Sequence, residues 1–209
     1  AERALQQASA FALERRQGKA IGAQAGEQSL IIEHPDVRRM LLTMRAYTDA
    51  MRCVLYANAA ALDVAKCHPD AEERQSASDR AELLTPISKA WCTDLGVEMT
   101  SLGIQVHGGY GYIEETGAAQ HLRDSRISPI YEGTNGIQAI DLVGRKLRMG
   151  EGKVMRDLLD EIGGFVEGLA EMGPEYETIK VNLADSLQAV EEATIWLNEK
   201  GKEDPLQAI

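Results

Sequence analysis

Residues 34–65 read HPDVRRMLLTMRAYTDAMRCVLYANAAALDVA, and this stretch decides the class of fold. Pro35 suits the first turn of a helix, where a backbone N–H has no partner within the helix in any case. Together with Thr48, apolar side chains recur at the spacing of one helix face: Val37, Met40, Leu41, Met44, Met51 and Leu55. The pattern predicts one long amphipathic helix that continues to about Ala65.

The flanking segments also have helical spacing. Apolar residues over 4–16 predict a shorter helix, and a loop rich in Gly, Ala and Gln follows at 18–26. A polar turn is expected at 67–75, because this segment contains Pro and Asp among charged residues. Helical spacing then resumes from about 76 to 106.

Two features interrupt the helical pattern beyond residue 80. Pro86 is expected to kink or restart its helix, with Thr85 as the cap of the new start. Residues 107–112 read HGGYGY, a glycine-rich turn that we do not expect to be regular helix. Further helices are expected at 118–123 and 135–149.

The composition agrees with an all-α fold. Of the 209 residues, 44% are hydrophobic and only 5% are aromatic, and β-branched residues rarely cluster. The formal net charge of −11 argues against a nucleic-acid or anionic-membrane partner, because binding phosphates requires clustered cations. We expect no membrane span, since no apolar run approaches the roughly 20 residues that a bilayer-spanning helix needs.

The charge changes at Gly150-Glu151-Gly152. Residues 1–150 hold 17 Lys+Arg and 19 Asp+Glu, a net charge of −2, whereas residues 151–209 hold 5 and 14, a net charge of −9. We expect a domain boundary here, with amphipathic helices at 153–171 and 174–199 beyond it. Two helices have too little surface for a core of their own, so we expect them to pack on something outside this chain.

Few residues indicate chemistry directly. The cysteines Cys53, Cys67 and Cys92 are far apart and are typical of reduced, buried thiols in a cytosol-like compartment. The four histidines have neither metal-ligand nor triad spacing, so no metal site is expected. Gly109-Tyr110-Gly111 follows a helix rather than a strand, which argues against a dinucleotide-binding fingerprint. This turn either ends a helix or lets a phosphate-bearing ligand approach the backbone.

Glu132 lies between an aromatic residue and a glycine, just before the helix that begins near Asn135. A carboxylate at such a junction either projects into a cavity, where Gly133 lets a ligand approach, or caps the helix. From the residues alone, capping is the better interpretation.

Several motifs follow one another along the chain: ALERRQG at 12–18, HPDVR at 34–38, QVHGGYGY at 105–112, LRD at 122–124 and IYEGTNGIQ at 130–138. Together they resemble the C-terminal domain of the acyl-CoA dehydrogenase flavoproteins, in the same order and over residues 1–149. The resemblance implies an up-and-down helical bundle. Residues from 151 onward resemble the start of the additional helical domain of a longer bacterial subfamily.

In that family Glu132 would be the catalytic base, which takes the α-proton of an acyl thioester while a β-hydride passes to FAD and a trans-2-enoyl-CoA forms. The resemblance places the following residues in the FAD site: Arg15, Gln17, His34, Gln105, Gly108, Gly109 and Thr134. Arg15, Gln105 and the two glycines would act across a subunit interface, and Thr134 within its own subunit. An aromatic residue common between positions 17 and 18 is missing, and Gly136 replaces a frequent glutamine, so the adenine end is expected to differ.

The resemblance further implies an acyl-CoA substrate, an electron-transfer flavoprotein as electron acceptor, a homodimer or homotetramer, and a bacterial cytoplasmic location. The helical and β domains that precede this region in the family are not in the sequence, so the chain alone is expected to be inactive. Two alternatives remain: a flavin-dependent acyl-CoA oxidase on the same scaffold, and a non-enzymatic nucleic-acid-binding relative, which the charge of the C-terminal part disfavours. A straight-chain and a methylthio acyl group are equally compatible with the sequence.

Overall fold

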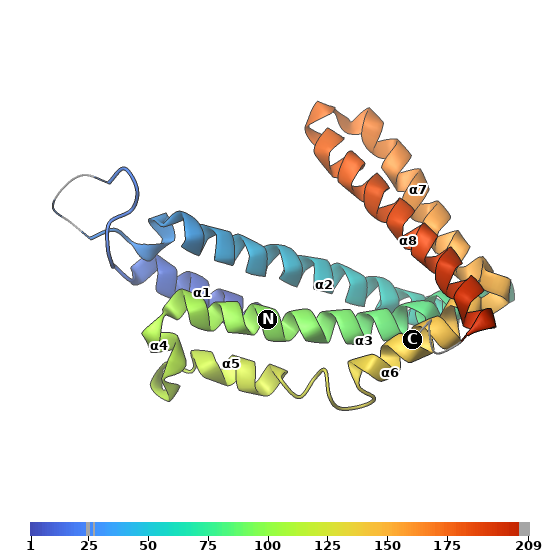
Figure 1. Cartoon of the computed structure of the whole chain (residues 1–209), viewed down its shortest axis with the longest axis horizontal. Helices are drawn as coiled ribbons and strands as arrows, with labels where there is room; N and C mark the ends of the chain where they lie inside the picture. The colour runs from blue at the N-terminus through green and yellow to red at the C-terminus, as the bar shows by residue number, and fades with distance from the viewer. Residues whose placement is uncertain (24–25, 27, 205–209) are drawn as a thin grey trace. The chain divides into compact units, whose positions relative to one another are not determined.

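The computed structural model describes residues 1–23, 26 and 28–204, and the regular elements of this part of the chain are helices (Figure 1). The α-helices are α1 Glu2–Glu14, α2 Pro35–Cys67, α3 Ala71–His107, α4 Gly109–Tyr112, α5 Ala118–Ser125, α6 Asn135–Gly144, α7 Lys153–Met172 and α8 Glu177–Glu203. Short 3-10 segments are η1 Ile31–Glu33, η2 Glu114–Thr116, η3 Lys146–Gly152 and η4 Pro174–Tyr176. The prediction of an all-α chain is confirmed.

The chain divides into two compact units. Unit 1 comprises residues 1–57 and 88–134, and unit 2 comprises residues 58–87 and 135–209. The division passes through α2 and α3, so each of these long helices contributes residues to both units. The domain boundary that the change in charge predicts near residue 150 stays a prediction.

The core of unit 1 forms where α1 lies close to α3. Ala8 and Ala12 of α1 are fully buried, and so is Met44 of α2. A Cβ atom added to Gly103 of α3 would lie 3.3 Å from the Cβ of Ala4. Small side chains on both helices therefore permit the close approach, and each large apolar side chain buried beside them contributes roughly 1.5–3 kcal/mol.

The glycine-rich turn is more regular than expected. α3 ends at His107, Gly108 takes a left-handed φ of 60°, and α4 then forms one turn of helix. The break from helical geometry is thus confined to Gly108, because a residue without a Cβ atom adopts this conformation at little cost. Gly111 is required for packing, since an added Cβ would lie 2.3 Å from the carbonyl oxygen of Ile104.

The expected restart at Pro86 is wrong, because α3 continues through it without interruption. The Thr85 hydroxyl donates a hydrogen bond to the Ala81 carbonyl oxygen (2.7 Å) within the helix, so it does not cap a new start. The actual cap is Asp70, whose Oδ1 accepts from the backbone N–H of Glu72 (2.7 Å) and Glu73 (3.2 Å). The expected turn at 67–75 is therefore shorter than predicted.

In unit 2, α7 and α8 form a helical hairpin (Figure 1). Part of their apolar surface is buried within this unit, whereas Phe165, Ile195 and Trp196 remain about half exposed, so the expectation that these helices pack on something outside the chain stays a prediction. Leu83 of α3 is fully buried in one cluster with Leu147 and Met155, and Leu159 of α7 and Leu197 of α8 pack against them. α3 and η3 thus supply part of the surface that two helices alone lack.

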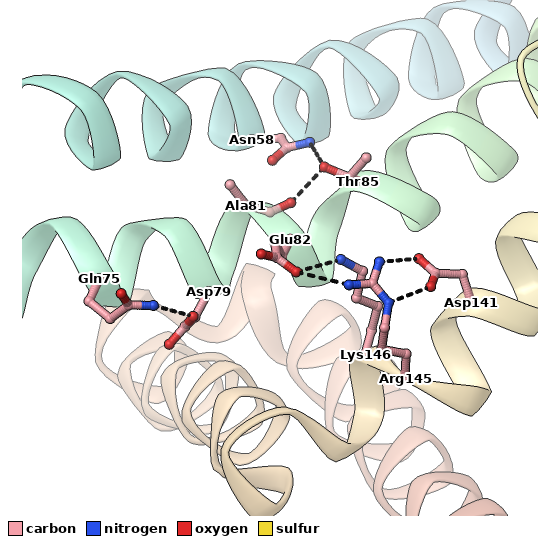
Figure 2. Close-up of polar contacts among 9 residues, drawn as sticks. All are labelled: Asn58, Gln75, Asp79, Ala81, Glu82, Thr85, Asp141, Arg145 and Lys146. Carbon is pink, nitrogen blue, oxygen red and sulfur yellow. Dashed lines mark hydrogen bonds and ion pairs between the residues drawn. The ribbon is translucent and has the colours of Figure 1, made fainter.

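A group of charged residues connects α3 to the end of α6 within unit 2 (Figure 2). The Lys146 ammonium lies 2.9 Å from Glu82 Oε2, and its side chain is only 5% exposed. Arg145 Nη1 lies 3.4 Å from the same oxygen, and Arg145 Nε donates to Asp141 Oδ1 at 2.8 Å. We call Glu82, Asp141, Arg145 and Lys146 the charge cluster. The hydrogen bond from Lys146 lowers the pKa of Glu82.

The expectation of buried cysteines is wrong for two of the three. Cys53 and Cys67 are exposed, and Cys92 is half-buried. Burial raises the pKa of the Cys92 thiol, which keeps it protonated at neutral pH. Cys53 and Cys67 lie in α2 outside its buried apolar face. The apolar context of these cysteines in the sequence did not show which face of the helix they occupy.

Gly111→Ala is expected to lower the free energy of unfolding by about 1–3 kcal/mol, because the new methyl group overlaps the Ile104 carbonyl. Urea unfolding of the chain measures this. Gly109→Ala is the matched control in the same helical turn, because an added Cβ there meets nothing within 4 Å. Equal midpoints for the two variants would contradict the packing described for Gly111.

Glu82→Gln is expected to lower the thermal midpoint of unfolding at pH 7. The difference in midpoint between wild type and variant is expected to become smaller as the pH falls. The folded state lowers the pKa of Glu82 from its ordinary value of 4.5, so its stabilising contribution is present above 4.5 and is lost as the pH falls through the lower folded value. Midpoints of wild type and variant between pH 7 and pH 3 test this. Glu167→Gln, an exposed glutamate of α7, is expected to show no such convergence.

Candidate functional site

The residues at the C-terminal end of α1 form contacts with each other and with the glycine-rich turn. The guanidinium carbon of Arg15 lies 5.1 Å from the centroid of the Tyr110 ring, a cation–π arrangement. Arg15 Nη2 also donates to Gln17 Oε1 at 3.4 Å. His34 Nε2 donates to the Gln17 carbonyl oxygen at 2.8 Å. Three of the expected site residues, Arg15, Gln17 and His34, are thus brought together.

Gln105, Gly108 and Gly109 lie on the other side of this contact, at the junction of α3 and α4. The backbone N–H of Gly108 donates to the Gln105 carbonyl oxygen at 3.0 Å, and the Gln105 side chain is exposed. A Cβ added to either glycine would meet nothing within 4 Å, so this backbone is open to a ligand. Because Tyr110 follows Gly109 directly, the six residues gather at one end of unit 1, where α1 ends and α4 lies (Figure 1).

Three residues that the sequence did not identify support this end of the unit. The ring of Phe11 stacks on that of the buried His107 with 4.5 Å between centroids. His107 Nδ1 donates to the Gly103 carbonyl oxygen at 2.7 Å. The ring of Tyr110 packs against the Arg15 guanidinium. The position of Tyr110 directly after two glycines was one sequence signal that could have identified it. The spacing of Phe11 and Arg15, one helical turn apart, was a second signal, because it places the two side chains on the same face of the helix.

Glu132 lies in the loop between α5 and α6, on backbone that few residues adopt. Its φ is 52°, and Gly133 follows with 81°. A left-handed conformation costs a non-glycine residue roughly 1–2 kcal/mol, and such outliers gather at functional sites. Glu132 is exposed, and Gly133 and Thr134 separate it from the start of α6 at Asn135. Within the described residues its carboxylate has no hydrogen-bond or ion-pair partner.

The structure does not bring Glu132 and Thr134 to the end of unit 1 that holds Arg15. α4 precedes α5 and the loop of Glu132 follows it, so the eight residues of α5, a length of about 12 Å, separate them along the chain. The expected site residues therefore form two groups within unit 1. We call them the arginine group (Arg15, Gln17, His34, Gln105, Gly108, Gly109) and the glutamate group (Glu132, Thr134).

A hollow of about 650 Å³ in unit 2 lies elsewhere. It is lined by residues of η3, α7 and α8, including Leu147, Met155 and Ile195, and by none of the expected site residues.

Among residues 1–23, 26 and 28–204, no group of three or more His, Cys, Asp or Glu side chains could hold a metal ion. In the same residues no helix is long and apolar enough to cross a membrane.

Comparison with known families assigns the chain to one class of protein. Residues 1–147 match the model of the family described as "Acyl-CoA dehydrogenase, C-terminal domain". The match covers both the arginine group and the glutamate group. The chain belongs to the acyl-CoA dehydrogenase family.

Two curated relatives illustrate the range of the family. The chain is 43% identical over 208 residues to the 3-methylmercaptopropionyl-CoA dehydrogenase of Ruegeria pomeroyi, a match that covers 100% of this chain and 35% of that protein. It is 42% identical over 141 residues to a butyryl-CoA dehydrogenase of Syntrophomonas wolfei, which covers 68% of this chain and 23% of the relative. The chain thus spans about a third or less of the length of these relatives.

Solved structures extend the likeness beyond the residues that the family model matches. Caenorhabditis elegans ACDH-11 in complex with C11-CoA superposes with a TM-score of 0.67 at 25% identity, over 98% of this chain and 32% of that one. An acyl-CoA dehydrogenase of Bacillus anthracis complexed with FAD gives a TM-score of 0.61 at 23% identity, over 97% and 39%, which shows the shared fold alone.

Proposed function

We propose that this chain is the part of an FAD-dependent acyl-CoA dehydrogenase that carries the catalytic base, Glu132. The observation that supports it most is the backbone of Glu132, which holds a carboxylate without a partner in a left-handed conformation. A residue kept in a costly conformation with an unused carboxylate fits a chemical role better than a structural one. By itself the 209-residue chain is proposed to be inactive, since it spans 35% of its R. pomeroyi relative.

In this proposal Glu132 accepts the α-proton of the acyl thioester. The carboxylate oxygen forms the new O–H bond, and the electron pair of the broken C–H bond moves into the forming double bond. The Glu132 backbone N–H is proposed to donate to the thioester carbonyl, which stabilises the negative charge that develops there. FAD, when bound, would supply the acceptor for the β-hydride, so the product is a trans-2-enoyl thioester.

The arginine group fits a cofactor that carries phosphate. Arg15 is held over Tyr110 and has no ion-pair partner among the described residues, so its guanidinium keeps donors for an anion. The bare backbone of Gly108 and Gly109 lets a bulky ligand come close. Gln17, His34 and Gln105 border this surface and are proposed to complete the adenosine diphosphate end of the FAD site, with Thr134 contacting the same half from another chain.

The separation of the two groups supports a homo-oligomer. α5 lies between the two groups along the chain. A cofactor that contacts both groups would therefore be held by the arginine group of one copy and the glutamate group of another. We propose a homodimer or homotetramer on this basis.

The substrate is proposed to be a saturated acyl-CoA, as the names of the R. pomeroyi and S. wolfei relatives indicate for those proteins. An electron-transfer flavoprotein is proposed as the electron acceptor. In support, a caffeyl-CoA reductase–Etf complex subunit of Acetobacterium woodii is 29% identical over 149 residues. The same scaffold could pass electrons to oxygen, and oxygen consumption by the full-length enzyme distinguishes the two.

Glu132→Gln in the full-length enzyme is expected to reduce kcat by at least about a thousandfold, because an amide cannot accept the α-proton. Acyl-CoA binding should remain within a few-fold of wild type, since shape and size are kept. Flavin reduction in single-turnover mixing measures the first effect and titration of the oxidised enzyme the second. Glu115→Gln, an exposed glutamate of unit 1, serves as the control and should turn over normally. Normal turnover by Glu132→Gln would refute the assignment.

Arg15→Gln is expected to weaken FAD binding by about tenfold to a hundredfold in the full-length enzyme, because a charge-assisted hydrogen bond to phosphate is worth roughly 1.5–3 kcal/mol. The Kd for FAD of the reconstituted apoenzyme measures this. Arg3→Gln changes an exposed arginine on the first turn of the same helix and should leave the Kd unchanged. An unchanged Kd for Arg15→Gln would remove Arg15 from the cofactor site.

A further inference from the structure

One face of α1 contacts the glycine-rich turn and the segments on both sides of it. Gln7, Phe11 and Arg15 are spaced four residues apart, so their side chains lie along one face of the helix. Phe11 stacks on His107 at the end of α3, and Arg15 lies over the ring of Tyr110 in α4. Gln7, the remaining residue of this face, contacts the segment that follows α4.

The side-chain amide of Gln7 is held in one orientation. Its Nε2 donates to the Thr116 carbonyl oxygen at 2.6 Å, and its Oε1 lies 3.0 Å from Nε2 of His121 in α5. A carbonyl oxygen can only accept, so the amide nitrogen must face Thr116, which leaves the amide oxygen to accept from the histidine ring. Both ends of this half-buried amide are therefore paired, with partners 109 and 114 positions further along the chain.

Thr116, the last residue of η2, connects Gln7 to α4. Its hydroxyl donates to the carbonyl oxygen of Tyr110 at 2.7 Å and lies 3.2 Å from that of Ile113. Carbonyl groups at the end of a helix have no partner within the helix, and α4 is only four residues long. Thr116 thus accepts a hydrogen bond from α1 through its backbone and donates one to α4 through its side chain.

α4 depends on such contacts for its position. A single turn of helix is not stable on its own, because it fixes several residues for few hydrogen bonds. Gly108, directly before α4, has no side chain to pack and has a φ of 60°. The packing of Gly111 limits how far α4 lies from α3, and Thr116 links α4 to α1. The place where the Tyr110 ring meets Arg15 therefore depends on Thr116 and, through it, on Gln7.

We propose that Gln7 and Thr116 are positioning residues for FAD: together they hold Tyr110 against Arg15, so that the Arg15 guanidinium is already in place when the phosphates of the cofactor bind. The inference rests on the proposed role of Arg15 in the FAD site. Neither Gln7 nor Thr116 touches the cofactor. An arginine side chain that is held before binding loses less conformational freedom on binding, so loss of this support weakens FAD binding and leaves the chemical step unchanged.

Thr116→Val in the full-length enzyme tests this, because it removes the hydroxyl and keeps the shape of the side chain. The Kd for FAD, measured by fluorescence titration of the apoenzyme, is expected to rise by about threefold to tenfold, the effect of losing one neutral hydrogen bond. At saturating FAD, kcat and the KM for acyl-CoA should stay within about twofold of wild type, since neither residue is near the reacting atoms in this proposal. Thr116→Ser keeps the hydroxyl and should restore the wild-type Kd.

Thr43→Val is the matched control in the same unit. The Thr43 hydroxyl donates to the Arg39 carbonyl oxygen at 2.8 Å, within α2, so the same change removes a hydrogen bond without involving α4. This variant should keep the wild-type Kd for FAD even where its thermal midpoint falls as far as that of Thr116→Val. An equal rise in Kd in the two variants, or no rise in Thr116→Val, would overturn the proposal.

A double-mutant cycle tests whether Thr116 acts through Arg15. If it does, adding Thr116→Val to Arg15→Gln should raise the Kd for FAD no further than Arg15→Gln alone. Effects that add in full would overturn the proposal, because Thr116 would then act independently of Arg15. If Arg15→Gln itself leaves the Kd unchanged, the proposed cofactor role of Arg15 fails. If Arg15→Gln weakens binding and Thr116→Val does not, only this inference fails.

Gln7→Met covers the case in which Thr116→Val does not fold. It keeps the length of the side chain and removes the amide that donates to the Thr116 carbonyl. The same rise in Kd is expected, again without a further rise when Arg15→Gln is added. Gln6→Met is its control, because the exposed Gln6 amide donates to Glu2 Oε1 at 2.8 Å within α1. A wild-type Kd in Gln7→Met, or the same rise in Gln6→Met, would refute the positioning role.

Discussion

The close packing of α1 on α3 determines the geometry of unit 1. Ala4 and Gly103 leave no large side chain where the two helices meet, so their axes come near each other and Met44 fills the space beside them. This approach brings the end of α1 beside the end of α3. Arg15 then lies over Tyr110, and Phe11 lies on His107. A larger residue at Ala4 would separate the helices and with them the arginine group.

The proposed base is positioned in a different way. Glu132 is not part of a regular element and is held in a left-handed conformation that its own sequence disfavours. Its loop follows α5, and the hydroxyl of Ser125 at the end of α5 lies 2.9 Å from that of Thr100 of α3.

Much of the fold could be predicted from the sequence, because helical periodicity and helix starts are local. The apolar stripe after Pro35 predicted α2 to within two residues of its end at Cys67. The prediction at Pro86 was wrong because it considered only the local cost of a proline within a helix. The burial of Leu83, which stabilises α3 as a continuous helix, comes from α7 and η3 and is not visible in the local sequence. The one-turn helix after Gly108 was missed because glycine content indicates freedom of the backbone and not the path it takes.

The candidate site was identified from a resemblance rather than from periodicity, and its residues stay predictions. Tyr110, Phe11 and the charge cluster were not identified, because their partners lie far away in the sequence: Arg15 for Tyr110, His107 for Phe11, and residues 63 and 64 positions beyond Glu82 for the charge cluster. The central claim, that Glu132 is the base, is tested most directly by a crystal structure of the full-length enzyme with FAD and a non-reactive acyl-CoA analogue. The account predicts a Glu132 carboxylate oxygen about 3–3.5 Å from the α-carbon of the analogue. A Glu132 side chain directed to solvent, with another carboxylate at the α-carbon, would contradict it.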